Sequence, residues 1–137
     1  MNRGLVCYKK LEEATQDALE EYDIRPRSTQ VTAATLSGGN QQKLVIAREF
    51  KYSPRFLIAA QPTRGVDVGA IEFIHKRILM ARAEGSGVLL VSSELDEILA
   101  LSDRILVMFE GKIVAEFRRG EVTEKALGLR MGGEVSL

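Results

Sequence analysis

A serine followed by two glycines stands directly before a helical pattern, within residues 35–43, Thr-Leu-Ser-Gly-Gly-Asn-Gln-Gln-Lys. Ser37 is a good helix N-cap, and glycines let the backbone approach a ligand closely. The helix behind them directs free N–H groups and its positive end forward, which favours an anion such as a phosphate. Taken alone, Ser-Gly-Gly more often marks a capped surface helix behind a glycine loop, so the wider sequence has to decide.

The longer string Leu-Ser-Gly-Gly-Asn-Gln-Gln-Lys resembles the signature motif of ATP-binding cassette (ABC) ATPases, with Asn40 where Gln is commonest. Its spacing to Pro-Thr-Arg-Gly-Val-Asp at 62–67 is also similar to that family. The resemblance covers roughly residues 30–120. It is closest to the second cassette of the tandem ATPase subunits that drive simple-sugar and nucleoside importers.

In ABC ATPases two cassettes face head to tail, and each ATP lies between the phosphate loop of one and the signature of the other. The resemblance therefore implies that Ser37, Gly38, Gly39, Asn40 and Gln41 bind ATP in trans. The hydroxyl and the glycine amides would stabilise charge on the γ-phosphate. ATP and Mg²⁺ would be held mainly by the partner cassette.

Asp67 corresponds to the loop that signals between the two nucleotide sites of the family. Its position before an apolar-periodic stretch also predicts an N-cap for the helix that follows. We expect both roles.

The residues that would bind phosphate and catalyse hydrolysis within this chain are missing or replaced. No Gly-x-x-x-x-Gly-Lys-Ser/Thr phosphate loop is found in the sequence. Ala60 and Gln61 stand where the family has a magnesium-holding Asp and a water-polarising Glu, and the following Pro-Thr fixes the register. Ser93 stands where the family has a switch histidine. Because an alanine and a glutamine supply neither metal ligand nor base, we predict a degenerate half-site with no catalysis in cis and no bound metal.

The amino-acid composition limits the kinds of partner and compartment that we expect. The 137 residues include 19 Lys and Arg and 19 Asp and Glu, so the formal net charge is zero. No excess of positive charge therefore indicates a nucleic-acid partner. One cysteine, Cys7, excludes an internal disulfide framework and fits a reducing compartment. No apolar run reaches the ~20 residues of a membrane span, and the start of the chain lacks the apolar core of a signal peptide.

Periodicity predicts alternating helices and strands, typical of an α/β domain with a mostly parallel sheet. The predicted helices are 8–22, 38–51, 68–83, 94–101 and 122–129. The predicted strands are 56–60, 88–91, 104–109 and 112–117, the first two buried on both faces and the last two forming an antiparallel hairpin. By resemblance, this is a partial P-loop NTPase-like ABC ATPase domain without the Walker A strand. Residues 1–52 would be part of the helical subdomain with the signature helix. Residues 53–137 would be part of the α/β core with the degenerate Walker B, D-loop, switch region and C-terminal hairpin.

In sheets of this family the phosphate-loop strand lies between the strands predicted here at 88–91 and 104–109. Unpaired buried backbone groups are costly, and open edges invite pairing. We therefore expect these two strands to pair directly, a second copy to insert a strand, or the piece to be marginally stable.

The favoured function is a fragment of an ABC importer's ATPase subunit, cytoplasmic and peripheral on the inner face of the membrane. Its partners would be another cassette, transmembrane permease subunits and, indirectly, a solute-binding protein, with no nucleic acid. The isolated chain should be inactive. Two alternatives stay open: a non-catalytic truncated cassette acting as scaffold or regulator, and a soluble ABC ATPase of repair or translation.

Overall fold

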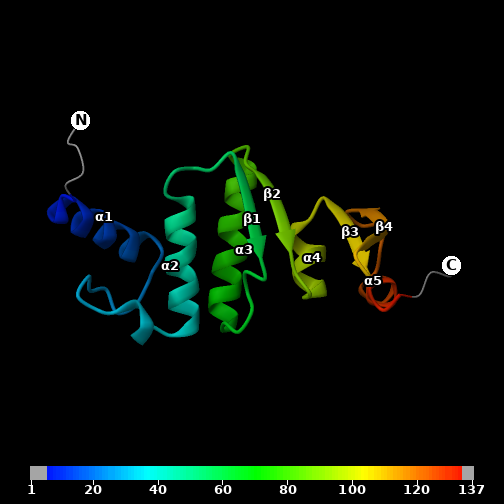
Figure 1. Cartoon of the computed structure of the whole chain (residues 1–137), viewed down its shortest axis with the longest axis horizontal. Coiled ribbons are helices and arrows are strands. Elements are labelled where there is room, and N and C mark those ends of the chain that lie inside the picture. Colours follow the sequence, from blue (N-terminus) through cyan, green and yellow to red (C-terminus); the bar gives the residue numbers. More distant parts are fainter. Residues whose placement is uncertain (1–5, 134–137) are drawn as a thin grey trace. The chain divides into compact units, whose positions relative to one another are not determined.

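The structure, a computed structural model, describes residues 6–133. The start of the chain, where the sequence shows no signal-peptide pattern, and residues 134–137 fall outside that range. The described residues form two compact units, drawn in Figure 1. One holds the residues up to Arg55 together with Thr63–Ser86, and the other holds Phe56–Pro62 and the residues from Gly87 onward.

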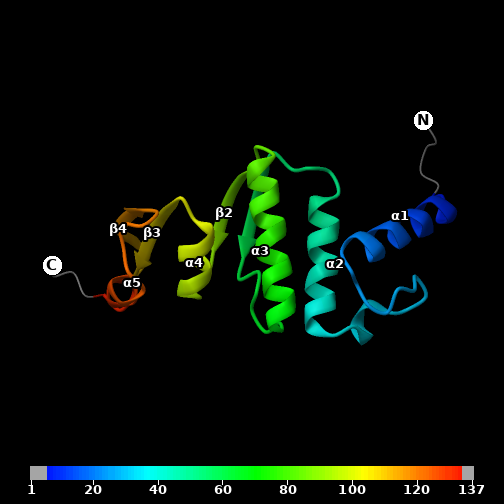
Figure 2. The same ribbon diagram turned by 180° about the vertical axis from the view of Figure 1, so that it is seen from behind.

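The first unit is helical. It contains α1 (Tyr8–Glu21), the short 3₁₀ turn η1 (Ala33–Thr35), α2 (Gly38–Phe50) and α3 (Val68–Ala83). The helices predicted at 8–22, 38–51 and 68–83 are thereby confirmed to within one residue at each end. Figures 1 and 2 show α2 lying beside α3 from both sides.

Buried aliphatic side chains hold the first unit together. Ile46 of α2 and Ile74 and Ile78 of α3 are buried, and Ile74 is fully so. In α1 the apolar stripe is buried only toward the C-terminal end, where Leu19 is 5% exposed. Tyr8, at the other end of the same stripe, is 79% exposed. The C-terminal end of α1 is therefore the part of this helix that packs against the rest of the first unit.

The second unit carries the strands. It contains β1 (Phe56–Ala60), β2 (Gly87–Val91), α4 (Leu95–Leu101), β3 (Arg104–Phe109), β4 (Lys112–Arg118) and α5 (Glu124–Met131). β1 and β2 pair in parallel, with Ile58 opposite Leu89 and Ala60 opposite Val91. The parallel pair and the alternation of helices with strands confirm the predicted α/β class.

The predicted hairpin is also confirmed, since β3 and β4 pair antiparallel with an irregularity after Val107. Glu110 and Gly111 in its turn both have positive φ, 46° and 76°, as the favoured two-residue hairpin turn requires. Ile105 and Val107 of β3 and Leu127 of α5 are the buried centre of a core that also takes in α4.

The prediction that the first two strands are buried on both faces is wrong for the described chain. Leu57 is buried, but Phe56 and Ile58 on the other face of β1 are 61% and 62% exposed. Leu89 and Val91 of β2 are about half exposed, and the strand register places them on the same face as Ile58. The unbroken apolar runs correctly predicted where these two strands lie. Within residues 6–133, however, one face of the sheet stays open.

Direct pairing of the strands predicted at 88–91 and 104–109 is not observed, because β2 and β3 belong to separate two-stranded sheets. The other two expected outcomes, an inserted strand and marginal stability, concern the chain in solution and stay predictions. Within residues 6–133, every helix is too short or too polar to cross a lipid bilayer.

Candidate functional site

The signature residues form the beginning of α2. Ser37 is the N-cap, as predicted: its Oγ accepts hydrogen bonds from the backbone N of Asn40 at 3.4 Å and from Asn40 Nδ2 at 2.9 Å. Ser37 and Gly38 are exposed, and the first turn of α2 holds no acidic residue that would offset the helix dipole. At this end of the 13-residue helix Gly38 is exposed and Gly39 is buried, while the N–H of Asn40 bonds to Ser37. The positive end of the helix has no acidic residue against it, which suits an anion.

The two glycines are needed where α2 meets the segment before α3. A Cβ built on Gly39 would lie 2.8 Å from Asp67 Oδ2 and 3.1 Å from the Cβ of Ala70. A Cβ on Gly38 would lie 3.3 Å from the carbonyl oxygen of Gly65. A side chain at position 39 would therefore clash inside the protein, in addition to any clash with a ligand in front of the helix.

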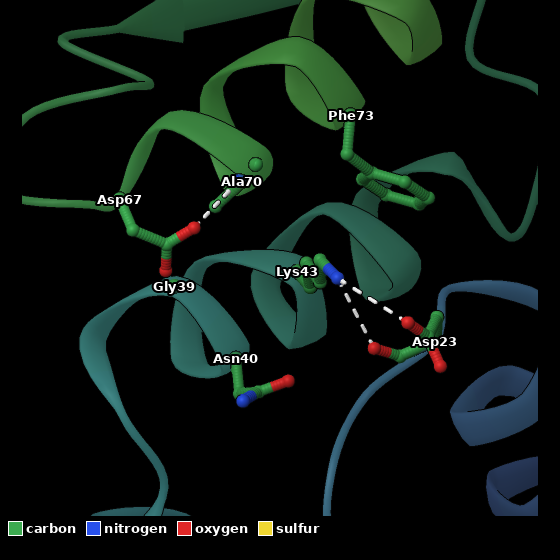
Figure 3. Close-up of a pocket in the computed structure, with 8 residues that line it drawn as sticks. Asp23, Gly39, Asn40, Lys43, Asp67, Ala70 and Phe73 are labelled. Atoms are coloured by element: carbon green, nitrogen blue, oxygen red, sulfur yellow. Dashed lines mark hydrogen bonds and ion pairs between the residues drawn. The ribbon is translucent and has the colours of Figure 1, made fainter.

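Asp67 contacts both helices. Its Oδ1 accepts a hydrogen bond from the backbone N of Ala70 at 2.9 Å and so caps α3, as Figure 3 shows. Its other carboxylate oxygen faces Gly39. The predicted cap is confirmed, and the role in signalling between nucleotide sites stays a prediction.

Behind these residues lies a pocket of about 340 Å³ between the beginnings of α2 and α3 (Figure 3). Its lining is Asp23, Gly39, Asn40, Lys43, Asp67, Gly69, Ala70 and Phe73. Lys43 Nζ donates to the carbonyl oxygen of Asp23 at 3.1 Å and lies 4.9 Å from the centre of the Phe73 ring. The last lysine of the signature string thus ties α2 to the turn after α1.

Asp23 is held in place by charge. Hydrogen bonds from the guanidinium groups of Arg27 and Arg25 hold the pKa of its carboxyl below the ordinary value. Lys43 Nζ adds an ion pair at 4.0 Å. The turn that follows α1 is therefore anchored to α2 at neutral pH.

Two of the three amide residues of the signature string, Asn40 and Gln41, are engaged within the unit. Asn40 Oδ1 accepts a hydrogen bond from the backbone N of Arg25 at 2.9 Å. Gln41 Nε2 donates to the carbonyl oxygen of Leu36 at 2.9 Å. Their predicted contact with ATP stays a prediction.

The positions predicted as a degenerate half-site come together at the end of β1. Gln61 follows the strand with a left-handed backbone (φ 49°), and its N donates to the carbonyl oxygen of Val91 at 2.7 Å. Its side-chain Oε1 accepts from both the backbone N and the Oγ of Ser93, each at 3.3 Å. Ala60, the last residue of β1, brings no polar group. The result is a neutral amide–hydroxyl pair without a carboxylate or an imidazole.

This pair cannot act as a general base near neutral pH, because neither group titrates there. Among residues 6–133, no three His, Cys, Asp or Glu side chains lie together where they could hold a metal ion.

Sequence reasoning missed the contacts that join α3 to the end of α1. The Arg77 guanidinium lies 4.1 Å from the centre of the Tyr22 ring and 5.3 Å from that of Phe73. Arg77 also donates to Oε1 of Glu21 at 2.9 Å and to its carbonyl oxygen at 3.0 Å. The contacts of Arg77 with Glu21 join positions 56 residues apart, so no local pattern signals them.

Comparison with known proteins shows what this chain is similar to. No family model matches the sequence. A nucleotide-free ATP-binding cassette from an ABC transporter matches the structure with a TM-score of 0.73 and 28% identity, covering 93% of this chain and 50% of that one. The nucleoside import ATP-binding protein NupA of Lactococcus lactis is 48% identical over 134 residues, which are 97% of this chain and 26% of the relative.

The fold of this chain is that of part of an ABC ATPase cassette. Further relatives are the guanosine import ATP-binding protein NupO of Bacillus subtilis, 53% identical over 92% of this chain, and the ribose import ATP-binding protein RbsA of Yersinia pestis, 45% identical over 89%. The chain spans about a quarter of the length of these relatives. The predicted resemblance to simple-sugar and nucleoside import ATPases is confirmed.

Proposed function

We propose that this chain is part of the ATP-binding subunit of an ABC importer for nucleosides or simple sugars. The names of the similar proteins support it, because import of nucleosides, guanosine or ribose is what those names state. The subunit would lie on the cytoplasmic face of the membrane, bound to transmembrane permease subunits that receive solute from a binding protein.

The beginning of α2, where Ser37 and Gly38 are exposed, carries the mechanistic part of the proposal. Ser37 O–H and the amides of Gly38 and Gly39 would donate hydrogen bonds to the γ-phosphate of an ATP held by a partner cassette. ATP with its Mg²⁺ supplies the phosphoryl group when bound. Donors that are already fixed by the helix and its cap need no reorganisation as charge develops, which is how such groups lower a barrier.

The residues of this chain fit one end of ATP. The signature end has fixed donors and no acidic residue in its first turn. The opposite half-site offers Gln61 and Ser93 hydrogen-bonded to each other in place of a base. We infer that the chain assists hydrolysis at a partner's site, does not hydrolyse ATP at its own half-site, and is inactive when isolated.

The geometry of that neutral pair also suits the second candidate, a non-catalytic cassette that acts as scaffold or regulator. Such a cassette would bind its partner, and its signature residues would not affect transport.

The two candidates separate in a transport assay on the complete subunit assembled with its permease in liposomes. ATP-driven uptake of labelled guanosine and ribose is measured for the unmodified complex, for Gly39→Ala and for Gly128→Ala. Gly39→Ala forces a Cβ to within 2.8 Å of Asp67 Oδ2, whereas a Cβ on Gly128 lies 3.6 Å from Leu95, an ordinary contact.

The importer proposal predicts uptake of one of these solutes, a loss of ~10-fold or more for Gly39→Ala, and little change for Gly128→Ala. Uptake that is equal in all three complexes would favour the scaffold. Absence of any ATP-driven uptake of either solute would contradict the importer proposal.

A further inference from the structure

We propose that Asn40 is a positioning residue that holds the Ser37 hydroxyl as a hydrogen-bond donor toward the anion in front of α2. This inference rests on the proposed function, because that function supplies the anion, the γ-phosphate of a partner's ATP. It assigns to Asn40 a role that acts through Ser37, in place of direct contact with ATP.

The orientation of the Asn40 amide is fixed by a backbone group. Arg25 N lies 2.9 Å from the Asn40 side chain, and a backbone N–H can only donate. The side-chain atom that faces Arg25 must therefore be Oδ1. The NH₂ group then points the other way, and Nδ2 lies 2.9 Å from Ser37 Oγ. Asn40 is a donor to the serine hydroxyl and has no alternative orientation that satisfies both contacts.

Two donors reach the same hydroxyl oxygen. Ser37 Oγ accepts from Asn40 Nδ2 at 2.9 Å and from the Asn40 backbone N at 3.4 Å. A hydroxyl has two lone pairs and one proton, so these bonds leave its proton as the group directed outward. Within residues 6–133, Ser37 O–H has no hydrogen-bond acceptor, and the residue is exposed. A phosphate oxygen in front of the helix is the kind of acceptor it lacks.

The support for Asn40 comes from outside α2. Arg25 belongs to the turn after α1, which Lys43 of α2 holds in place through the carbonyl oxygen and the carboxylate of Asp23. The hydrogen bonds thus run from the backbone of that turn through the Asn40 amide to the serine hydroxyl. The packing of α1 on α2 therefore helps to orient the Ser37 hydroxyl.

The most informative substitution is Asn40→Asp, which is nearly isosteric. A carboxylate still accepts from Arg25 N, but it cannot donate to Ser37 and accepts the serine proton instead. The proton then turns inward. Asn40→Ala removes the side-chain donor without adding a charge, and Asn40→Gln keeps the amide.

The experiment measures ATP hydrolysis by the complete subunit assembled with its permease, in the unmodified and the S37A background. We expect Asn40→Asp to lower kcat ~10–100-fold and Asn40→Ala ~3–10-fold, while Asn40→Gln restores most of the rate. In the S37A background the loss from Asn40→Ala disappears, and the loss from Asn40→Asp shrinks to the effect of its charge. Such coupling distinguishes action through the serine from general weakening of the fold.

Equal losses in both backgrounds, or no loss from Asn40→Ala and Asn40→Asp, would overturn the positioning role while leaving the proposed function intact, provided that S37A alone is impaired. A normal rate in S37A alone would contradict the proposed function itself. Thermal unfolding of each complex accompanies the kinetics, and a loss from Asn40→Ala that follows reduced stability in both backgrounds would also overturn the inference.

Discussion

Ser37 and Asp67 begin the two helices that meet at the signature, and each does so with a side-chain oxygen bonded to a backbone N three residues ahead. These caps could be predicted from sequence, because an N-cap depends on a residue type and its position before an apolar-periodic stretch. The contact of Asn40 with Arg25 spans 15 positions. It depends on how α1 packs against α2, so no local pattern could predict it.

At this scale, Asp67→Ala should lower the free energy of unfolding by about 1 kcal/mol, because the N–H of Ala70 loses its acceptor. Asp67→Asn keeps an oxygen acceptor and should lose a few tenths of a kcal/mol at most. Urea denaturation of both variants measures the difference. Equal stability of Asp67→Ala and the unmodified chain would show that the cap contributes nothing.

Besides the buried aliphatic side chains, a small number of charged contacts around the turn after α1 join the helices of the first unit. Arg77 covers Tyr22 and bonds to Glu21, while Lys43 bonds to Asp23. Helix bounds were predictable because apolar spacing and breakers such as Ser53-Pro54 are local. Strand positions were predictable for the same reason, but their burial was not, since burial depends on which other residues cover the sheet.

The turn after α1 makes the first unit sensitive to acid. The pKa of Asp23 is lowered in the folded chain, chiefly by the hydrogen bond from Arg27. A carboxyl with a depressed folded pKa stabilises the fold above its unfolded value of 3.8, and this contribution is lost as the pH falls through the folded pKa. Asp23→Asn should therefore lose stability at about pH 6 and show a smaller further loss on going to about pH 3.

Urea midpoints of the unmodified chain and Asp23→Asn at both pH values test this expectation. The Arg104–Glu116 ion pair lowers the pKa of Glu116 in the same way, so some acid sensitivity remains in the variant. An unchanged pH dependence in Asp23→Asn would show that the Asp23 contacts do not stabilise the fold.

Over the whole molecule, the chain leaves an apolar sheet face open. Phe56 and Ile58 of β1 lie beside Leu89 and Val91 of β2, all between 47% and 62% exposed. Contiguous exposed apolar surface drives association. The α/β class and the similarity to ABC ATPases were predictable from the motifs, whereas the open face depends on which residues cover the sheet and was not predictable. The predicted division of the chain at residue 52 stays a proposal.

The isolated chain should therefore be marginally stable or self-associate. Sedimentation velocity at increasing concentration should show a shift to larger species, and the double substitution Ile58→Thr with Val91→Thr should reduce it. Lys9→Ala, on exposed α1, serves as the control. A monodisperse monomer of high thermal stability in the unmodified chain would contradict this argument.

The central claim is that the chain serves a partner's ATP through its signature and contributes little through its own half-site. The most direct test compares the ATPase rates of Ser37→Ala and Gln61→Ala in the complete subunit assembled with its permease. Loss of one donor to the γ-phosphate should lower the rate ~10²–10³-fold in Ser37→Ala. Gln61→Ala breaks the contact with Ser93 but removes no catalytic group, so its rate should stay within a factor of about 3. Equal losses in the two variants would contradict the account, because the active half-site would then be the one assigned as degenerate.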